Sequence, residues 1–364
     1  MQVAVATDSQ TALRYPVRCP IVRPMARPSY HLFEDETMTS PDETHRLANC
    51  LTEAYFPGLP GFERGKVRDS YDLPDGRRIM IATDRQSAFD KVLTAVPYKG
   101  QVLNQTAQFW FEQTADICPN HLLDVPDPNV VVGRRLDMLP VEMVVREYLT
   151  GTTETSIWTM YEQGERVIYG HEFADGMVKN QKLPQTIITP TSKGEPGAHD
   201  APLTATEIVS SGLIEAARWE KLVRISLMLF ARGRRIAAEN GLILVDTKYE
   251  FGIDESGGIV LADEIHTPDS SRYWQANSYR ARMAAGSEPE SLDKEFLRLW
   301  IAERCDPYKD RIPDIPHDTL IAFSAKYVSL YETVTGRAFV PPRADENVRA
   351  RIEANLSRAF PEYF

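Results

Sequence analysis

Acidic and basic side chains alternate along one predicted strand in the second half of the chain. Asp246, Lys248 and Glu250 stand two residues apart within residues 241–265, and alternate residues of a β-strand point to the same face. Two carboxylates beside an ammonium group suit a site for Mg²⁺ and phosphate, because hard cations prefer oxygen ligands and a lysine balances phosphate charge. The alternation leaves a second interpretation open, a solvated strand face with a surface ion pair.

A turn and a second strand follow the charged strand. Residues 254–258 read Asp-Glu-Ser-Gly-Gly, which favours a chain reversal, and residues 259–265 then carry Asp263 and Glu264. The hairpin brings these acids towards the first strand. Whether Glu250 lies opposite Asp263 depends on a register that periodicity does not determine.

Two short segments near the start of the chain carry cations and hydroxyl groups. Gly65 stands beside Lys66 and Arg68, a pattern suited to lie over nucleotide phosphates, although neither a P-loop nor a G-x-G-x-x-G motif is present. A polar loop with Ser87 and Asp90 then interrupts a strand that is otherwise apolar. Such loops often hold polar ligands, and a capped turn is the alternative.

An arginine leads out of an apolar strand into small hydroxyl residues. Arg146 precedes Thr150-Gly151-Thr152, and a guanidinium fork with hydroxyl groups and an approachable backbone suits a phosphate. Pairing of Arg146 with Glu142 or Glu147 is the alternative.

Two polar loops and one link add further candidates. Residues 189–200 are long enough for a functional loop or lid, and they contain Lys193 and Asp200. A later proline turn contains Ser271 and Arg272. The remaining candidates, Leu136 and Met138, lie in a short link between two predicted strands of a second sheet. This link would suit a hinge between lobes, where an adenine could bind main-chain groups.

Composition limits the class of protein. The chain has 364 residues, 43% of them apolar, and a net charge of −11, which predicts a folded protein and argues against nucleic acid or an acidic membrane as partner. The four cysteines show no C-x-x-C spacing, so free thiols in a reducing cytoplasm are expected. The sequence contains no apolar run long enough to span a membrane.

The order of elements predicts two lobes after an N-terminal arm. Residues 1–37 alternate arginine with proline, so we expect a poorly ordered or surface-draped arm, and Met38 is a candidate for the true start. Helical periodicity is present in residues 104–114, 215–240, 293–305, 317–333 and 345–360.

Together these segments resemble the SAICAR synthetase family, from about residue 65 to residue 274 and more loosely to the C-terminus. The most specific parts are LPVEMVVR with TGT at 139–152 and LVDTKYEFG at 244–252, and GKVRD, SAFD, TPTSK and DEIHTPDSSRYW follow the family order. One departure is visible, because Thr152 stands where family members usually have serine.

The resemblance implies an α+β fold of the SAICAR synthetase-like, ATP-grasp-like type, with two lobes, antiparallel sheets and C-terminal helices. Residues 38–136 would form a nucleotide-covering lobe and residues 137–364 the catalytic lobe. It also implies a cytoplasmic enzyme, a monomer or small homo-oligomer, that uses ATP and Mg²⁺ to join L-aspartate to carboxyaminoimidazole ribonucleotide (CAIR) through an acyl phosphate, giving SAICAR, ADP and phosphate.

The resemblance also implies a role for each matching residue. Catalysis would fall to Asp246, Lys193 and Lys248; ATP binding to Gly65, Lys66, Arg68, Leu136, Met138, Glu250 and Asp263; substrate binding to Ser87, Asp90, Arg146, Thr152, Lys193, Asp200, Ser271 and Arg272; and the metal to Glu250 and Asp263. A small-molecule kinase on a related scaffold and a nucleotide-binding module without catalysis are the competing hypotheses.

Overall fold

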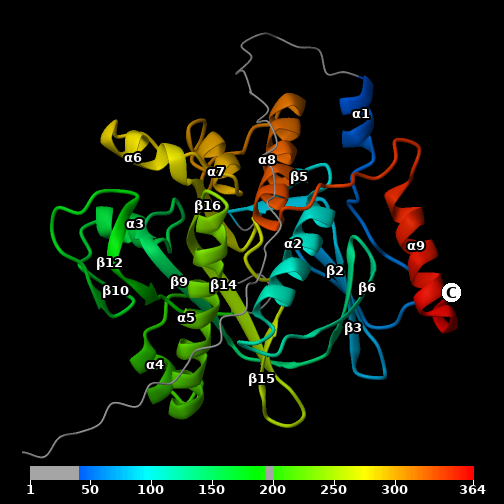
Figure 1. The fold of residues 1–364 in the computed structure, drawn as a ribbon, viewed down its shortest axis with the longest axis horizontal. Helices are drawn as coiled ribbons and strands as arrows, with labels where there is room; N and C mark the ends of the chain where they lie inside the picture. Colours follow the sequence, from blue (N-terminus) through cyan, green and yellow to red (C-terminus); the bar gives the residue numbers. More distant parts are fainter. Residues whose placement is uncertain (1–40, 90, 194–200) are drawn as a thin grey trace, which may run out of the picture. The chain divides into compact units, whose positions relative to one another are not determined.

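The computed structural model describes residues 41–89, 91–193 and 201–364, which lie within the compact unit Thr39–Phe364 (Figure 1). The predicted N-terminal arm, Met38, Asp90 and Asp200 lie outside the described residues. The fold is α+β with antiparallel sheets, as predicted.

The first sheet is built from five antiparallel strands in the order β1-β2-β3-β7-β6. Its strands are β1 (Phe62–Arg64), β2 (Arg68–Asp72), β3 (Arg77–Ala82), β6 (Leu122–Asp127) and β7 (Val130–Arg134). A hairpin of β4 (Arg85–Ala88) and β5 (Lys91–Ala95) and helix α2 (Lys99–Thr114) stand between β3 and β6 in the chain. Alternation in β3 and β7 places Ile79, Ile81 and Val132 in one apolar core.

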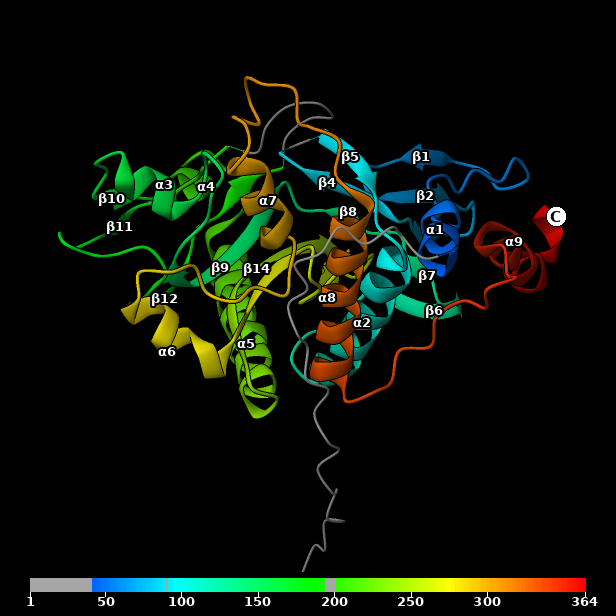
Figure 2. The same cartoon turned by 90° about the horizontal axis from the view of Figure 1, so that it is seen from above.

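The last long helix, α9 (Val348–Ala359), packs on this first sheet (Figures 1 and 2). Its residues Val348, Ile352 and Leu356 share the core of Ile79 and Val132. The helix was predicted at residues 345–360, in the segment assigned to the catalytic lobe, and it packs on a sheet formed by the other segment. An apolar stripe indicates that a helix packs against another element, but the stripe does not indicate which sheet that element belongs to.

The second sheet is centred on one long strand, β14 (Leu242–Ile253), which pairs with four others. The strands of this sheet besides β14 are β8 (Asp137–Met138), β9 (Val141–Leu149), β12 (Gln181–Ile188), β13 (Thr191–Ser192), β15 (Ile259–Ala262) and β16 (Ser271–Gln275). Helix α5 (Ala216–Glu239) packs against β14 and β9. Trp219 and Phe230 of α5 share a core with Tyr249 and Phe251 of β14, so one face of β14 is apolar and covered.

The other elements complete the chain. They are α1 (Pro41–Ala48), α3 (Ile157–Glu162), β10 (Val167–Ile168), β11 (His171–Glu172), α4 (Ala205–Ser210), α6 (Ala276–Ala284), α7 (Glu295–Ala302), α8 (His317–Thr335) and the short 3₁₀ helix η1 (Pro361–Tyr363). Helix α8 packs on α2 in a third core. The five helices predicted above are confirmed, with ends moved by a few residues, and neither α3 nor α6 was predicted.

Within the described part of the chain, every helix is too short or too polar to cross a membrane. Cys50, Cys118 and Cys305 carry free thiols, as predicted for the cysteines that the structure describes.

Candidate active site

The uncovered face of β14 carries the predicted alternation of charge. Strand β9 pairs with β14 so that Arg146 stands beside Asp246 and Val144 beside Lys248. Because this pairing aligns the pleats of the two strands, the charged side chains of both project to the same side, opposite α5. The predicted common face for Asp246, Lys248 and Glu250 is therefore confirmed.

Two adjoining cavities open on this face. The first, of about 440 Å³, is lined by these predicted site residues: Lys66, Arg68, Ser87, Arg146, Asp246, Lys248, Asp263, Ser271 and Arg272. The second, of about 650 Å³, is lined by Gly65, Lys66, Arg68, Leu136, Met138, Lys193, Glu250 and Asp263. Three predicted ATP-binding residues, Lys66, Arg68 and Asp263, line both cavities. The described residues predicted to bind substrate line only the first cavity, except Lys193, which lines the second, and Thr152. Thr152 lines neither cavity.

A row of alternating charges stands where the two cavities meet. The Nζ of Lys248 donates to Glu142 Oε1 at 2.6 Å and to Glu250 Oε1 at 2.5 Å. The Nζ of Lys193 lies 2.7 Å from Glu250 Oε2, and the hydroxyl of Thr191 donates to Glu142 at 2.9 Å. Lysines and acids therefore hold one another in place on the cavity wall.

The row shifts the pKa values of its members. Burial would lower the pKa of Lys248, but the carboxylates of Glu250 and Glu142 outweigh burial and hold that pKa well above its ordinary value. Burial would likewise raise the pKa of Glu250, and the ammonium groups of Lys248 and Lys193 lower it to about 2. Both groups are consequently charged at neutral pH.

Two buried arginines meet on one carboxylate in the first cavity. Asp246 Oδ2 lies 2.6 Å from Arg272 Nη1 and 3.3 Å from Arg146 Nη1. Arg272 also pairs with Glu295 at 3.3 Å, and the Thr152 hydroxyl donates to the same glutamate at 2.9 Å. The proposed alternative for Arg146, pairing with Glu142 or Glu147, is not what the structure has. Thr152 contacts the phosphate-binding candidates only through Glu295.

Several charged residues of the first cavity were not predicted as site residues. They are Glu142, Glu264, Asp269, Asp293, Lys294 and Arg298. Burial, with Arg298 nearby, lowers the pKa of Lys294 to about 8, and the buried Nε of Arg298 has no hydrogen-bond partner among the described residues. The spacing of Lys294 and Arg298, four residues apart at the start of a predicted helix, was the available signal.

The strand β2 and the residues before it bring cations to both cavities. Arg68 forms ion pairs with Asp263 and, at 2.6 Å, with Glu264. Arg85 donates to the carbonyl oxygens of Gly65 at 3.0 Å and Lys66 at 3.2 Å, which fixes the chain at the cavity edge. A side chain at position 65 would meet the carbonyl oxygen of Arg68 at 2.9 Å, so glycine suits this turn.

The link between the two sheets passes along the second cavity. Strand β8 pairs with β14 so that Met138 stands beside Gly252. A Cβ at Gly252 would lie 2.6 Å from the Leu136 side chain, which explains why glycine allows this close approach. The two strands that this link joins were predicted to share one sheet, but β7 belongs to the first sheet and β9 to the second. A hinge at Leu136 and Met138, and adenine binding there, stay predictions.

The register of the hairpin is now defined. Glu250 pairs with Ala262, and β15 ends there. The next residue, Asp263, has a φ of 59°, an unfavourable conformation for a non-glycine residue that is common where function constrains the backbone. This turn lets Asp263 reach the second cavity beside Glu250 although the two residues are not directly opposite each other.

The donor set fits a divalent cation that is shared with phosphate groups. Among the described residues no cluster of three acids, histidines or cysteines could hold a metal by itself. Mg²⁺ usually takes only one or two protein carboxylates together with phosphates and water. Glu250 and Asp263 supply that number of carboxylates on one cavity, each with a cation beside it.

Comparison with known proteins gives one consistent family. The family model described as SAICAR synthetase matches residues 61–315. A relative from Agrobacterium fabrum, provisionally named phosphoribosylaminoimidazole-succinocarboxamide synthase 2, is 59% identical over 311 residues, covering 85% of this chain and 98% of its own. The phosphoribosylaminoimidazole-succinocarboxamide synthase of Legionella pneumophila strain Paris is 51% identical over 310 residues, covering 85% and 98%.

Solved structures have the same fold. The SAICAR synthase of Saccharomyces cerevisiae, complexed with SAICAR, superposes with a TM-score of 0.68 at 30% identity, over 79% of this chain and 99% of that one. A SAICAR synthetase in complex with ADP gives a TM-score of 0.59 at 25% identity, over 77% and 99%.

Proposed function

The chain belongs to the SAICAR synthetase family, and we propose that its paired cavities ligate L-aspartate to CAIR at the expense of ATP. It is a carbon–nitrogen ligase of purine biosynthesis. The observation that carries the proposal is the row Glu142–Lys248–Glu250–Lys193, which joins the wall of one cavity to that of the other. A reaction between a nucleotide and a second substrate needs two binding cavities that meet, and this row lies where they do.

The chemistry explains why two cavities must meet. A carboxylate is a poor acylating agent because its leaving group would be oxide. Transfer of the γ-phosphoryl group from ATP to the CAIR carboxylate gives an acyl phosphate and ADP. The amine of aspartate then attacks the acyl carbon, phosphate leaves, and the amide nitrogen loses a proton. Most of the catalysis in such a transfer comes from positioning and charge neutralisation.

We assign the nucleotide to the second cavity. Its wall combines the link residues Leu136 and Met138 with the cations Lys66 and Arg68, which suits an adenine at one end and phosphates at the other. The relative solved with ADP supports ATP as a substrate. Arg68 is half-buried and paired with Asp263 and Glu264, so an incoming phosphate meets a guanidinium that is already oriented.

We assign the ribonucleotide to the first cavity. Arg146 and Arg272 converge there on Asp246, and a guanidinium fork matches phosphate oxygens. Lys294 and Arg298 add two further cations to the same wall. The relative complexed with SAICAR supports a ligand of this type. Ser87 and Ser271 line the same cavity, and the binding roles of Asp90, Thr152 and Asp200 stay predictions.

Glu250 and Asp263 are the residues that would hold Mg²⁺. When bound, the metal would neutralise phosphate charge during the transfer. The protein's own contribution is the oriented ammonium groups of Lys248 and Lys193, whose positions on either side of Glu250 place positive charge where the carboxylate and the γ-phosphate meet. Asp246 in turn orients the two arginines of the first cavity, which both pair with it.

The small-molecule kinase alternative has no support from the comparisons. An assay of ADP and phosphate release, with each substrate omitted in turn, tests the ligase assignment. We expect inorganic phosphate only when ATP, CAIR and L-aspartate are all present. Stoichiometric ADP release with phosphate retained on an organic product would contradict the assignment.

A further inference from the structure

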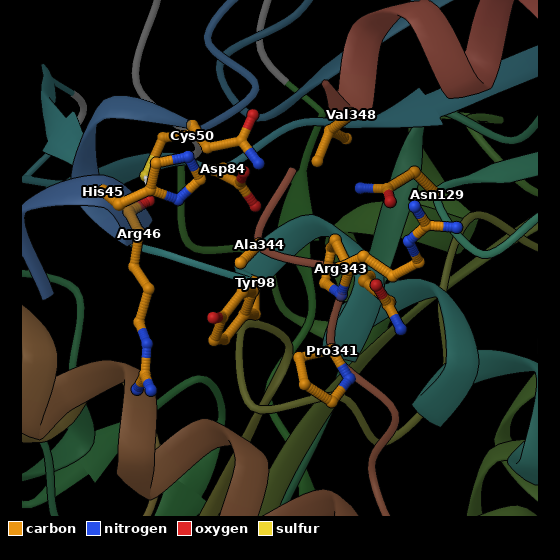
Figure 3. A pocket seen from close by; sticks show the side chains of 13 residues that line it. His45, Arg46, Cys50, Asp84, Tyr98, Asn129, Pro341, Arg343, Ala344 and Val348 are labelled. Atoms are coloured by element: carbon orange, nitrogen blue, oxygen red, sulfur yellow. Dashed lines mark hydrogen bonds between the residues drawn. The ribbon is translucent and has the colours of Figure 1, made fainter. Parts of the chain in front are cut away.

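A third cavity, of about 140 Å³, lies away from β14 and shares no lining residue with the first two. It is enclosed by α1, the start of α2, the turn before β7 and the segment before α9 (Figure 3). In that view Asp84 and His45 lie at one side and Asn129 and Arg343 at the other.

The inner end of this cavity carries a carboxylate that has no ion pair among the described residues. Asp84 is buried, and its oxygens accept hydrogen bonds only from backbone N–H groups, from Leu51 at 2.7 Å and from Gly100 at 2.9 Å. Burial raises the pKa of Asp84 to about 6, so the group is mostly ionised at neutral pH. Each oxygen retains a lone pair for a further donor.

A second acceptor on the cavity wall lacks a donor. Gln101 is 3% exposed, and its amide nitrogen donates to the carbonyl oxygen of Val340 at 2.8 Å. Its Oε1 has no hydrogen-bond partner within the described ranges. Buried polar atoms are nearly always satisfied, and one that is not needs an explanation. A ligand that donates hydrogen bonds to Asp84 and Gln101 supplies it.

The rim and the volume narrow the class of ligand. His45 and Arg343 are exposed at the edge of the cavity, and Arg46 also lines it. Arg343 pairs there with Asp345 at 2.8 Å, and such an exposed ion pair is weak in water, so a ligand carboxylate can replace Asp345 at the outer end. Cavities of roughly 150 Å³ hold molecules of about six to ten non-hydrogen atoms. The ligand must therefore donate hydrogen bonds at one end, carry an anionic group at the other and have about this number of atoms. A free α-amino acid meets all three conditions.

We propose that the third cavity is a regulatory site for a free amino acid, with the ammonium group on Asp84 and Gln101 and the carboxylate towards the basic rim. Two short connections tie it to the active site. Arg85, the neighbour of Asp84, donates to the carbonyl oxygens of Gly65 and Lys66 at the nucleotide cavity. Lys99, the neighbour of Gly100, pairs with the substrate-cavity residue Asp269 at 2.7 Å.

Calorimetric titration of the full-length enzyme with the standard L-amino acids tests the proposal. L-Aspartate is left out because it is a substrate. We expect at least one amino acid to bind with a dissociation constant of about 1 mM or tighter. Gln101→Leu should weaken that binding about tenfold or more, and Asp84→Asn should do the same. Gln108→Leu, the same change on the same helix outside all three cavities, should leave it unchanged.

The outcomes separate this site from the ligase assignment. Absence of binding by every amino acid, or equal binding by wild type, Gln101→Leu and Asp84→Asn, would overturn the proposal while ligase activity is retained. Thermal unfolding identifies a variant that fails to fold, and Gln101→Leu leaves the backbone contacts of Asp84 intact. The bound amino acid should change KM for ATP by about twofold or more. An unchanged KM would overturn the regulatory role.

Discussion

The two faces of β14 use the same alternating pattern for opposite purposes. On the cavity face, Lys248 and Glu250 are charged and hold each other at 2.5 Å. On the covered face, Tyr249 bonds His266 at 2.5 Å, and burial lowers the pKa of His266 to about 3, so that this pair is neutral. The difference teaches that charge lies on the face that opens on the two cavities, while neutral packing on the opposite face holds the strand in place.

The largest expected effect comes from the cavity face. Glu250→Gln should lower kcat about 10²- to 10³-fold, or about 3–4 kcal/mol, because it removes a carboxylate proposed to hold the metal and releases Lys248 and Lys193. Steady-state ADP release measures the fall in kcat, and thermal unfolding should show that the Glu250→Gln variant is folded. Glu255→Gln, the same change in the exposed hairpin turn, is the control. Wild-type turnover in Glu250→Gln would remove this residue from the site.

The second-largest expected effect distinguishes the ligand of the first cavity from that of the second. Arg146→Ala should weaken ribonucleotide binding by about 2–4 kcal/mol, because it removes a phosphate fork and unbalances Asp246. ATP binding, measured by equilibrium titration, should change by less than about 1 kcal/mol. Arg166→Ala, at an exposed pair with Asp175, is the control. Equal losses for both ligands would contradict the assignment of Arg146 to the ribonucleotide.

Acid should reduce the contribution of the covered face of β14 to folding stability, through the titration of His266. The lowered pKa of His266 means that its neutral form is the folded one, so its contribution is complete above the unfolded value of about 6.5 and declines as the pH falls towards 3. His266→Gln removes this titration. The stability gap between wild type and variant, measured by denaturant unfolding, should shrink by about 2 kcal/mol between pH 7 and pH 4.5. A constant gap would mean that His266 is not held neutral.

The smallest expected effect tests whether the covered face of β14 influences catalysis on the cavity face. Tyr249→Phe removes the hydroxyl that bonds His266 and should cost about 1 kcal/mol of stability. Because the neighbouring Lys248 and Glu250 point the other way, kcat should stay within about twofold. A tenfold fall in kcat would show that the covered face acts directly on the chemistry.

Local pattern was enough to predict much of this arrangement. Period-two alternation predicted the charged face of β14, and helical spacing predicted α2, α5, α7, α8 and α9. The motifs that resemble the family predicted part of the lining of both cavities. These features depend on neighbours along the chain, where a single sequence carries a direct physical signal.

Features that depend on distant contacts could not be predicted. Lys99 is buried against Asp269, 170 residues away, and neither residue has a local feature that reveals the pair. The return of α9 to the first sheet and the bonding of Thr152 to Glu295 also join remote segments. The turn after β15 is a further case, because the positive φ of Asp263 is not indicated by the alternation of residues along the strand.

The central claim is that the charged face of β14 allows a carboxylate to be phosphorylated before an amine attacks it. Isotope transfer tests this most directly, with CAIR carrying ¹⁸O in its carboxylate, unlabelled ATP and L-aspartate, and mass analysis of the phosphate released. The account predicts that each phosphate gains one oxygen from the carboxylate. Phosphate without ¹⁸O would contradict it, because the carboxylate oxygen would then have left by another route.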